Sequence, residues 1–464
     1  MNYIPTEKER QEYLAYDSYH AFFENLENGL QNLRKYTFSR KRKKVVLIAG
    51  AMVAFDKGTI AFINNLVQKD SSRQYVLFSE VTAENRRKTQ EQIHFTSICT
   101  PHLLAKEILV PHLEVPVTEE ILQYISERVY LQQAVDNLNV RHKNIGNGYA
   151  EALMYYADRY IKELLRVIRP SCVVLWNEFY AFHMVMSALC RKNKIPLRYM
   201  EFGCVPGTFV IEKSGQQGES FPARHPHLFR CCPVTSGDIK KAVQIAEYIY
   251  RTELNRNVQP PRCGLQAMAS HWKTNTPVIT YMGQNDYESG LYPYTKKTRK
   301  YHSPSFKSTL EGLEFLRLLS IKNDWRLIYK PHPIMLNTDN RKELSTERRD
   351  NGSYCSNGII CIENVNIHEV IDFSDVIITI LSQSAYVSLF RNKPVVMMGY
   401  TQLKGSGCTY EAFSKEQIEP QIRKALKEGF SKKQMKNFHR HIARAVKYYL
   451  LDDGTHPDIP FGIK

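Results

Sequence analysis

Two basic side chains at the end of an apolar run are typical of a phosphate-binding turn. The segment Trp325-Arg-Leu-Ile-Tyr-Lys330-Pro-His332-Pro333 reads as a buried strand followed by a stiff turn. Prolines on both sides of His332 restrict the backbone, so the imidazole can be aimed at a ligand at little entropic cost, and Lys330 adds a positive charge. Because open α/β sheets bind ligands at the carboxyl ends of their strands, we interpret this turn as a phosphate or diphosphate site. A structural turn with a surface lysine is the alternative.

Hydroxyl and amide groups follow a second apolar run, residues 375–381, where a helix is expected to begin. Ser382, Gln383 and Ser384 stand at that position. A helix amino terminus suits a nucleotide phosphate, while a serine cap without a ligand is the alternative. Slightly upstream, Glu369 lies in another short helical segment and is a candidate acceptor of hydrogen bonds from ribose hydroxyls.

A third strand exit carries a glycine and two polar side chains. Gly283, Gln284 and Asp286 follow the apolar run 278–282. Gly283 permits close approach of the backbone, and the two polar side chains can hydrogen-bond to ligand hydroxyls. A plain exit from a strand into a loop is the alternative.

Two carboxylates end strands in the first half of the chain. Glu178 follows the run 172–176, and Glu201 follows the run 197–200. A carboxylate in such a place can deprotonate a hydroxyl or act as a nucleophile. Residues expected to contact a second substrate nearby are Asn177, Gly203, Gly50, Asp56 and Lys57.

These strand exits require a scaffold in which strands and helices alternate. Such alternation runs from residue 44, stops in a proline-containing segment near residue 260, and restarts at residue 278. It predicts an α/β protein with two doubly wound parallel sheets. Capping boxes are expected at Ser414-x-x-Gln417 and Ser431-x-x-Gln434. The expected domains are a helical extension at 1–43, a Rossmann-like domain at 44–254, a linker at 255–276, a second Rossmann-like domain at 277–430, and a closing helix and tail at 431–464 that packs back on the first domain.

The charge distribution predicts an anionic partner. The net charge is +16 over 464 residues, with basic runs at 34–44, 296–300 and 432–447. An acidic polysaccharide or the acidic inner leaflet of a membrane would be attracted by such runs, although each run can also be a solvated face. No nucleic-acid-binding motif is present, so nucleic acid is not an expected partner.

Other sequence features favour a cytoplasmic protein without a bound metal. The ten cysteines include no C-x-x-C pair, which argues against a zinc ribbon or a disulfide framework. The amino terminus lacks the pattern of a secretory signal. The apolar stretch 173–190 carries Asn177, Glu178 and His183, which makes it a poor membrane span. We expect a cytoplasmic location, with peripheral association with the inner membrane as an option.

The motifs together resemble the bacterial capsule polysaccharide synthesis family, which includes the β-Kdo transferases. The matching segments are Glu201-Phe-Gly203-x-x-Pro206-Gly207-Thr208, Gly283-Gln284-x-Asp286, Lys330-Pro-His332-Pro333, Ser382-Gln383-Ser384 and Asn392-Lys393-Pro394-Val395. After the last segment this chain has Gly399-Tyr-Thr where those relatives often carry Gly-Trp-Gly, so the resemblance leaves the donor sugar open.

The resemblance implies a GT-B glycosyltransferase in which two Rossmann-like domains face one another across a cleft. It would transfer a sugar, best matched by Kdo from CMP-Kdo, to a lipid-linked or growing surface polysaccharide. No metal or cofactor is implied, and the expected partners are the nucleotide-sugar, an anionic polysaccharide or glycolipid acceptor, and other capsule assembly proteins. The expected donor-binding residues are Gln284, Asp286, Lys330, His332, Glu369, Ser382, Gln383 and Ser384.

The remaining expected roles concern catalysis and the acceptor. Glu178, Glu201 and His332 are the candidates for catalysis, and Gly50, Asp56, Lys57, Asn177 and Gly203 are those for acceptor binding. This interpretation depends on the turns near residues 330 and 382 lying side by side. A polyol-phosphate transferase that uses CDP-glycerol or CDP-ribitol stays open, because such enzymes carry a similar Lys-Pro-His-Pro element. A non-catalytic assembly factor that binds polysaccharide also stays open.

Overall fold

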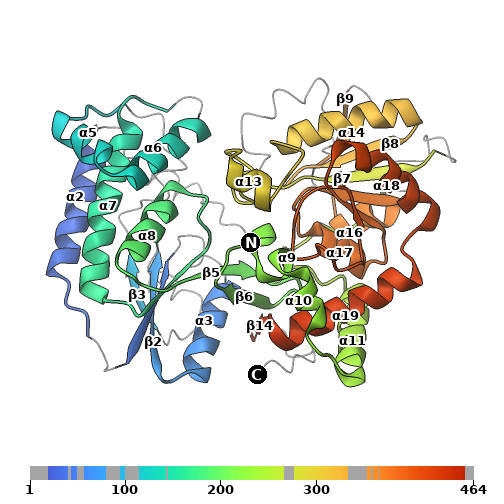
Figure 1. The fold of residues 1–464 in the computed structure, drawn as a ribbon, viewed down its shortest axis with the longest axis horizontal. Helices are drawn as coiled ribbons and strands as arrows, with labels where there is room; N and C mark the ends of the chain where they lie inside the picture. Colours follow the sequence, from blue (N-terminus) through green and yellow to red (C-terminus); the bar gives the residue numbers. More distant parts are fainter. Residues whose placement is uncertain are drawn as a thin grey trace. The chain divides into compact units, whose positions relative to one another are not determined.

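The chain folds into two α/β units in a computed structural model (Figure 1). The structure describes residues 19–39, 43–49, 57–79, 95–99, 114–142, 145–265, 276–332, 353–356, 359–363 and 365–454. Unit 1 comprises Met1–Glu201, Phe209–Gly215 and Asp452–Thr455, and unit 2 comprises Phe202–Thr208, Gln216–Leu451 and His456–Lys464. Each unit is built on its own sheet, so the expected α/β class with two Rossmann-like sheets is confirmed.

The first sheet has seven strands among the described residues, in the order β14-β6-β5-β4-β1-β2-β3. Strands β1 to β5 pair in parallel. The strands are β1 (Lys44–Ala49), β2 (Arg73–Ser79), β3 (Thr96–Cys99), β4 (Cys172–Leu175), β5 (Leu197–Phe202), β6 (Thr208–Glu212) and β14 (Leu451–Asp452). The helices are α2 (Tyr19–Lys35), α3 (Lys57–Lys69), α5 (Glu119–Ser126), α6 (Val129–Arg141), α7 (Tyr149–Ile168) and α8 (Ala181–Lys192).

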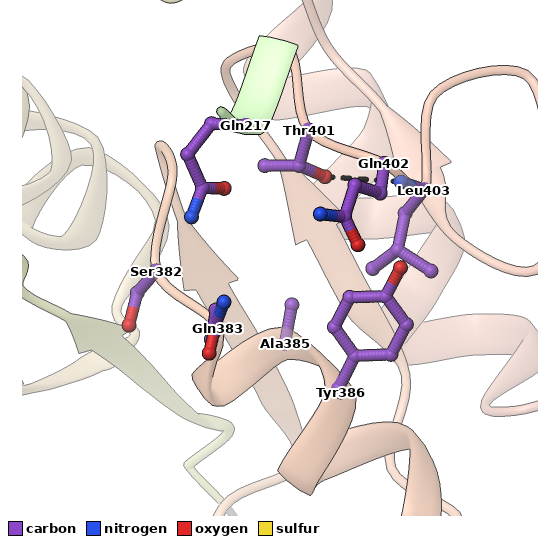
Figure 2. Close-up of a pocket in the computed structure, with 8 residues that line it drawn as sticks. All are labelled: Gln217, Ser382, Gln383, Ala385, Tyr386, Thr401, Gln402 and Leu403. Atoms are coloured by element: carbon purple, nitrogen blue, oxygen red, sulfur yellow. Dashed lines mark hydrogen bonds between the residues drawn. The ribbon is translucent and has the colours of Figure 1, made fainter. Parts of the chain in front are cut away.

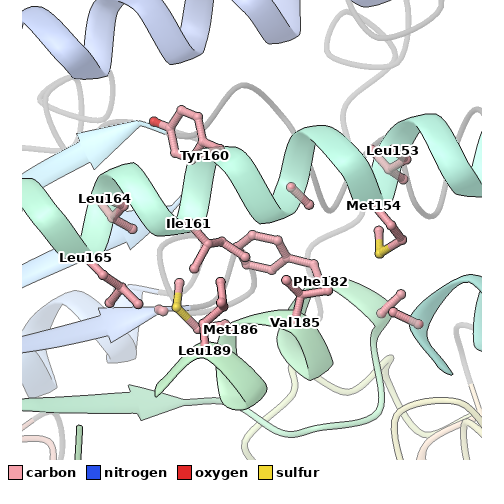
Figure 3. Close-up of a cluster of buried hydrophobic side chains, with 14 of the residues drawn as sticks. Leu153, Met154, Tyr160, Ile161, Leu164, Leu165, Phe182, Val185, Met186 and Leu189 are labelled. Atoms are coloured by element: carbon pink, nitrogen blue, oxygen red, sulfur yellow. The ribbon is translucent and has the colours of Figure 1, made fainter. Parts of the chain in front are cut away.

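The core of unit 1 forms where α7 packs against α8 (Figure 3). Apolar side chains recur along α7 at spacings of three and four, which places them on one face of the helix. From α8, the buried side chains of Phe182, Val185, Met186 and Leu189 meet that face. Burying each of these side chains contributes about 1.5–3 kcal/mol, which fixes α8 and therefore the exit of β4 that precedes it.

The second sheet also has seven described strands, in the order β13-β12-β11-β7-β8-β10-β9. Its strands are β7 (Val278–Met282), β8 (Arg326–Lys330), β9 (Ser353–Ser356), β10 (Ile359–Ile362), β11 (Val376–Thr379), β12 (Val395–Met397) and β13 (Tyr410–Glu411). All neighbouring strands pair in parallel except β9 with β10. Every residue of β7, β11 and β12 is buried, as expected for parallel strands covered on both faces.

Helices cover both faces of the second sheet. Helices α14 (Thr309–Asn323) and α18 (Lys415–Glu428) lie on one face, and α16 (Ile367–Phe373) and α17 (Ser384–Phe390) lie on the other (Figure 1). From β7 the chain adds β8 and β10 on one side, and it then adds β11, β12 and β13 on the other side. Because crossovers between parallel strands are right-handed, the connecting helices of these two halves lie on opposite faces of the sheet. The other elements of unit 2 are the 3-10 turn η3 (Gln217–Glu219), α9 (Phe221–Arg224), α10 (Pro226–Cys231), α11 (Ser236–Thr252), α13 (Lys296–Tyr301) and α19 (Lys432–Tyr448). Both expected capping boxes, at the starts of α18 and α19, are present.

The division into units corrects the expected domain boundary. Residues 216–254 were expected in the first domain, but they group with unit 2. The physical reason is the packing of α11 and the segment before it on α19, where Lys447 Nζ pairs with Asp238 Oδ2 at 2.7 Å and Tyr448 Oη donates to Pro233 O at 2.6 Å. Strand β14 extends the first sheet, whereas α19 belongs to unit 2. The packing of the whole segment 431–464 on the first domain stays a prediction.

None of the helices in the described part of the chain combines the length and the apolar character that crossing a bilayer requires.

Candidate functional site

The carboxyl ends of β7, β8 and β11 form one edge of the second sheet. Strand β7 pairs with β8 on one side and with β11 on the other, and the chain changes sides between β10 and β11. This edge is therefore the topological switch point, where open α/β sheets bind ligands. The three turns that the sequence singled out all lie here, but β7 separates the other two strands. The sequence predicted that the turns near residues 330 and 382 lie side by side. That prediction is corrected here, because the β7 turn lies between them.

Backbone and side-chain hydrogen bonds join these three turns. Gly283 N donates to Lys330 O at 2.9 Å, and Thr379 Oγ1 donates to Met282 O at 3.0 Å. A Cβ atom on Gly283 would lie 3.0 Å from the hydroxyl of Tyr329, which is tighter than most contacts. Glycine therefore lets the β7 turn approach the β8 turn closely.

The polar side chains of the β7 turn are bound inside the protein. Gln284 Nε2 donates to Thr309 Oγ1 at 2.7 Å and to Asp286 Oδ1 at 3.1 Å, and Gln284 Oε1 accepts from Leu381 N at 3.1 Å. Asp286 Oδ2 accepts from Thr309 N at 2.9 Å, at the start of α14. Burial raises the pKa of Asp286, although the bonds from Thr309 oppose that rise. The structure gives both residues a role in the framework, and contact with donor hydroxyls stays a prediction.

The β8 turn carries a lysine and a histidine whose pKa values are shifted by burial. Lys330 Nζ donates to Glu363 O at 2.8 Å, and burial lowers the pKa of Lys330 to about 8. Burial also lowers the pKa of His332 to about 4, helped by the positive charges of Arg256 and Lys330. At neutral pH, Lys330 is therefore mostly charged, while His332 is a neutral hydrogen-bonding group.

Arg256 joins this site from a segment that was expected to be a linker. Its Nη1 donates to Gln383 Oε1 at 2.8 Å, and its guanidinium lies 4.2 Å from the centre of the Phe202 ring. Gln383 Nε2 in turn donates to Phe202 O at 3.1 Å. Sequence reasoning missed Arg256 because its partner Gln383 is 127 residues away and no local motif marks it. With Lys330 and His332, it forms what we call the basic cluster.

The serine turn after β11 is held by its own hydroxyl groups. Ser382 Oγ accepts from Ser384 N at 3.2 Å and from Ser384 Oγ at 2.9 Å, and Ser382 N donates to Thr379 Oγ1 at 3.1 Å. Helix α17, which begins here, has only seven residues. We therefore assign the positive charge at this edge to the basic cluster rather than to the helix.

Glu369 lies in α16 and contacts the segment before β7. Its carboxylate accepts hydrogen bonds from Cys263 N at 2.9 Å and from Leu265 N at 2.5 Å. Burial raises its pKa, but these backbone donors outweigh burial and hold the pKa of Glu369 below its usual value. The carboxylate thus anchors the segment that carries Arg256, and binding of a ribose stays a prediction.

A small pocket opens at the same edge of the sheet, on the β12 side (Figure 2). It is a shallow depression: about 220 Å³ of space lies among its lining atoms, open solvent included, and none of that space admits a water-sized sphere. The residues that line it are Gln217, Ser382, Gln383, Ala385, Tyr386, Thr401, Gln402 and Leu403. Only Ser382 and Gln383 were expected from the sequence. The other lining residues were not predicted, because none of them belongs to a polar motif that directly follows an apolar run.

In unit 1, the carboxylate of Glu178 is bound by groups of the protein itself. It accepts hydrogen bonds from Ser187 Oγ at 2.6 Å, from Tyr199 Oη and from Arg191 Nη2, with which it forms an ion pair. These contacts tie the exit of β4 to α8 and β5. Glu201 is buried at the end of β5.

The expected acceptor residues are distributed unevenly. Asn177 is buried, and its Oδ1 accepts from Phe179 N at 3.0 Å and lies 3.2 Å from His183 Nδ1. Gly203 shapes the turn between β5 and β6, because a Cβ atom there would lie 2.0 Å from Thr208 Oγ1. Gly50 and Asp56 lie outside the described residues, and Lys57 begins α3.

Among the residues that the structure describes, no cluster of three or more His, Cys, Asp or Glu side chains is arranged to hold a metal ion.

Part of the chain matches a known protein family, and several solved structures are similar to it. Residues 296–446, about a third of the chain, match the family model described as capsule polysaccharide biosynthesis protein. No curated protein gives a significant match. Similar solved structures include the β-Kdo 2,7 transferase KpsC of Thermosulfurimonas dismutans, at 15% identity and a TM-score of 0.38 over 70% of this chain and 89% of that one. They also include a UDP-GlcNAc 2-epimerase of Methanocaldococcus jannaschii, at 11% identity and a TM-score of 0.37 over 86% and 98%. Residues 296–446 are thus similar to the capsule polysaccharide biosynthesis family, and the motifs at Lys330, Ser382 and Asn392 lie within the matched residues.

Proposed function

We propose that this chain is a glycosyltransferase of capsule polysaccharide synthesis that uses a cytidine nucleotide donor. The observation that carries the proposal is the basic cluster at the switch point of the second sheet, where parallel α/β sheets bind nucleotides. The match to the capsule family includes β8 and β11, two of the strands that form this edge. The sequence resemblance to β-Kdo transferases supports CMP-Kdo as the donor and a lipid-linked or growing polysaccharide as the acceptor.

In this proposal the basic cluster binds the phosphate of the donor. Lys330 keeps most of its charge at neutral pH, and partial burial strengthens its attraction to a phosphate oxygen. Neutral His332 contributes a ring nitrogen, and the guanidinium of Arg256 contributes its positive charge beside it. As the bond to the sugar breaks, negative charge grows on the departing phosphate, and these groups stabilise it without a metal ion.

His332 offers the most direct test of nucleotide binding. We expect isothermal titration with CMP to give a measurable affinity for the wild-type protein, and at least a tenfold weaker affinity for His332→Ala, because one hydrogen bond to a charged group is lost. Circular dichroism would confirm that the variant is folded.

Two results of this titration would count against the proposal. A wild-type protein that ignores CMP but binds polysaccharide would be an assembly factor rather than a transferase. Binding of CMP that is equally tight in wild type and His332→Ala would place the phosphate elsewhere.

The proposal assigns deprotonation of the acceptor hydroxyl to one of the two carboxylates expected from the sequence, Glu178 or Glu201, and a pair of variants distinguishes them. Glu178 is committed to Ser187, Tyr199 and Arg191, so it holds the scaffold. We expect Glu201→Gln to lose at least a hundredfold in turnover while CMP affinity is kept, because a general base contributes about 10²–10⁴ in rate.

The matched variant is Glu178→Gln. We expect it to lower the thermal midpoint of unfolding and to keep turnover per folded molecule. Mass spectrometry of the glycan product, with CMP-Kdo as donor, measures turnover. If Glu178→Gln is inactive and stable while Glu201→Gln is active, the assignment is reversed. If the double variant keeps full turnover, a polyol-phosphate transfer becomes the better description.

A further inference from the structure

The basic run 432–447, which the proposed function does not use, lies in α19. One of its charges is neutralised, because Lys447 Nζ pairs with Asp238 Oδ2 at 2.7 Å. Another lies beside α10, where Arg444 Nε donates to Cys232 O at 3.1 Å. Helices α10 and α19 are in contact (Figure 1). The run therefore brings positive charge to the surface around α10.

Cations from three separate segments crowd this surface. Burial lowers the pKa of Arg444, and the positive charges of Arg440 and Arg230 lower it further. Burial raises the pKa of Glu411, and the charges of Lys404 and Arg230 oppose that rise. A segment that follows β12 therefore adds its charge to those of α10 and α19. An anionic partner would relieve the repulsion among these cations.

Two further cations extend the surface to α13. The Arg224 guanidinium, at the end of α9, lies 5.5 Å from the centre of the Tyr301 ring, and Lys300 Nζ lies 4.9 Å from it. A hydrogen bond with Lys300 and the charges of both cations lower the pKa of Tyr301. We call this surface the α10 face, and it comprises Arg224, His227, Leu228, Arg230, Lys300, Lys404, Arg440 and Arg444.

Two carboxylates lie near these cations and are held by other groups. Glu411 is half-buried, and its Oε1 accepts a hydrogen bond from Gly405 N at 2.5 Å. Glu219 is buried and pairs with Lys297 Nζ at 2.9 Å. The cations of the α10 face outnumber these two carboxylates, so the face carries a net positive charge at neutral pH.

A large aliphatic side chain stands among the cations. Leu228 of α10 is 59% exposed, and its neighbour Phe229 is buried. The Phe229 ring packs 5.5 Å from the ring of His441 and 6.0 Å from that of Tyr449, which fixes α10 on α19. This packing leaves Leu228 at the surface. A single exposed leucine is ordinary, but one surrounded by cations is typical of a surface that lies in a membrane interface.

This combination favours a lipid surface over an acidic polysaccharide. A polysaccharide can neutralise the cations, but it offers little apolar surface to an aliphatic side chain. A bilayer that contains anionic lipid offers both, because its headgroups attract arginine and lysine and its acyl boundary accepts a leucine.

We propose that the α10 face docks on an anionic phospholipid surface, with Arg224 and Arg230 at headgroup phosphates and Leu228 at the boundary between headgroups and acyl chains. The inference goes beyond the proposed function, because it holds whichever sugar the protein transfers. It assigns to unit 2 a membrane contact that is separate from the basic cluster.

Vesicle flotation tests the electrostatic part of this inference. We expect the wild-type chain to float with vesicles of phosphatidylethanolamine and phosphatidylglycerol but not with vesicles of phosphatidylcholine alone. Salt at about 1 M, where the Debye length is about 3 Å, should release it. The double variant Arg224→Gln, Arg230→Gln is expected to bind about thirtyfold more weakly, which corresponds to about 1 kcal/mol for each removed charge.

Two matched variants control for net charge and for packing. The double variant Lys424→Gln, Lys427→Gln removes the same charge from the exposed side of α18 and should bind like wild type. The double variant Arg224→Lys, Arg230→Lys keeps the charge and should stay within about twofold of wild type. Circular dichroism confirms that each variant is folded.

Leu228 tests the apolar part. We expect Leu228→Gln to bind the anionic vesicles several-fold more weakly, because a polar side chain gains nothing at the acyl boundary. Ile321→Gln on α14 is the control, since Ile321 is 62% exposed and lies outside the α10 face, and it should bind like wild type.

Three results would overturn the inference. If the α18 variant weakens vesicle binding as much as the Arg224 and Arg230 variant, net charge and not the α10 face attracts the membrane. If Leu228→Gln binds as tightly as wild type, no side chain enters the bilayer and the argument for a lipid surface fails. If wild type ignores the vesicles but binds polygalacturonate through Arg224 and Arg230, the face binds an acidic polysaccharide. None of these results bears on CMP binding, so the proposed function is tested separately.

Discussion

The turns after β7 and β8 lie side by side on the second sheet and use their polar residues in opposite ways. In the β7 turn, Gln284 and Asp286 are committed to Thr309 and Leu381, so their hydrogen-bonding capacity is spent on the protein. In the β8 turn, burial lowers the pKa of Lys330 to about 8, and the charged amine is held at one backbone oxygen.

A polar residue at a strand end is therefore not by itself a sign of ligand binding. A buried polar group that is fully paired stabilises the fold. Burial of a cation costs free energy, which shows in the lowered pKa of Lys330, and such costs are concentrated at functional sites. We therefore regard the β7 turn as the framework and the β8 turn as the place of chemistry. Variants of the two turns can show whether this distinction is wrong.

Asp286→Ala should have the largest effect, and the effect should be on stability. The substitution leaves the backbone N–H of Thr309, the hydroxyl hydrogen of Thr309 and one amide hydrogen of Gln284 without their acceptor in the interior. Each unpaired buried group costs about 1–3 kcal/mol, so we expect the free energy of unfolding to fall by about 3 kcal/mol. Urea denaturation followed by circular dichroism measures this change.

The control for that prediction is Asp136→Ala on the exposed face of α6, which we expect to change stability by less than about 0.5 kcal/mol. The affinity of folded Asp286→Ala for CMP should match that of wild type. A variant that keeps its stability but loses CMP would mean that the β7 turn binds the ligand, and the contrast with the β8 turn would disappear.

The sequence alone predicted those strands and helix starts that are marked by residues close together in the chain. Buried parallel strands are nearly continuous apolar runs, which made β7, β8, β11 and β12 recognisable, and the serine-x-x-glutamine pattern located the starts of α18 and α19. The three turns at the switch point followed from the same reasoning, because the carboxyl ends of parallel strands share one edge.

The parts that could not be predicted depend on contacts between distant segments. Arg256 enters the basic cluster through Gln383, and Gln217 reaches the pocket because Gly218 fits between Tyr301 and Tyr400. No spacing within either segment encodes such a contact. The expected domain boundary near residue 255 differs from the division into units for the same reason. A proline-containing stretch shows where regular structure stops, but it does not show that α11 packs on α19.

A second test of the difference between the β7 and β8 turns is the pH dependence of CMP affinity. We expect the change in binding free energy to be smaller than the loss of stability in Asp286→Ala. A bound phosphate favours the charged form of Lys330 and raises its pKa, so binding above pH 8 requires uptake of a proton. The affinity for CMP is then highest below about pH 7, where Lys330 is charged, and it falls by up to tenfold per pH unit as the pH rises through 8. A phosphate monoester has its second pKa near 6, so CMP itself does not titrate in this range.

Lys330→Met is the matched variant, because it keeps the length and apolar stem of the side chain and removes the charge. We expect about tenfold weaker binding of CMP at pH 7 and no further loss up to pH 9.5, measured by titration calorimetry. His332 stays neutral throughout that window, since its pKa is about 4, and it contributes no slope. A wild-type affinity that is constant from pH 7 to pH 9.5 would show that the ammonium of Lys330 does not contact the phosphate. The β8 turn would then be framework like its neighbour, and phosphate binding would fall to Arg256.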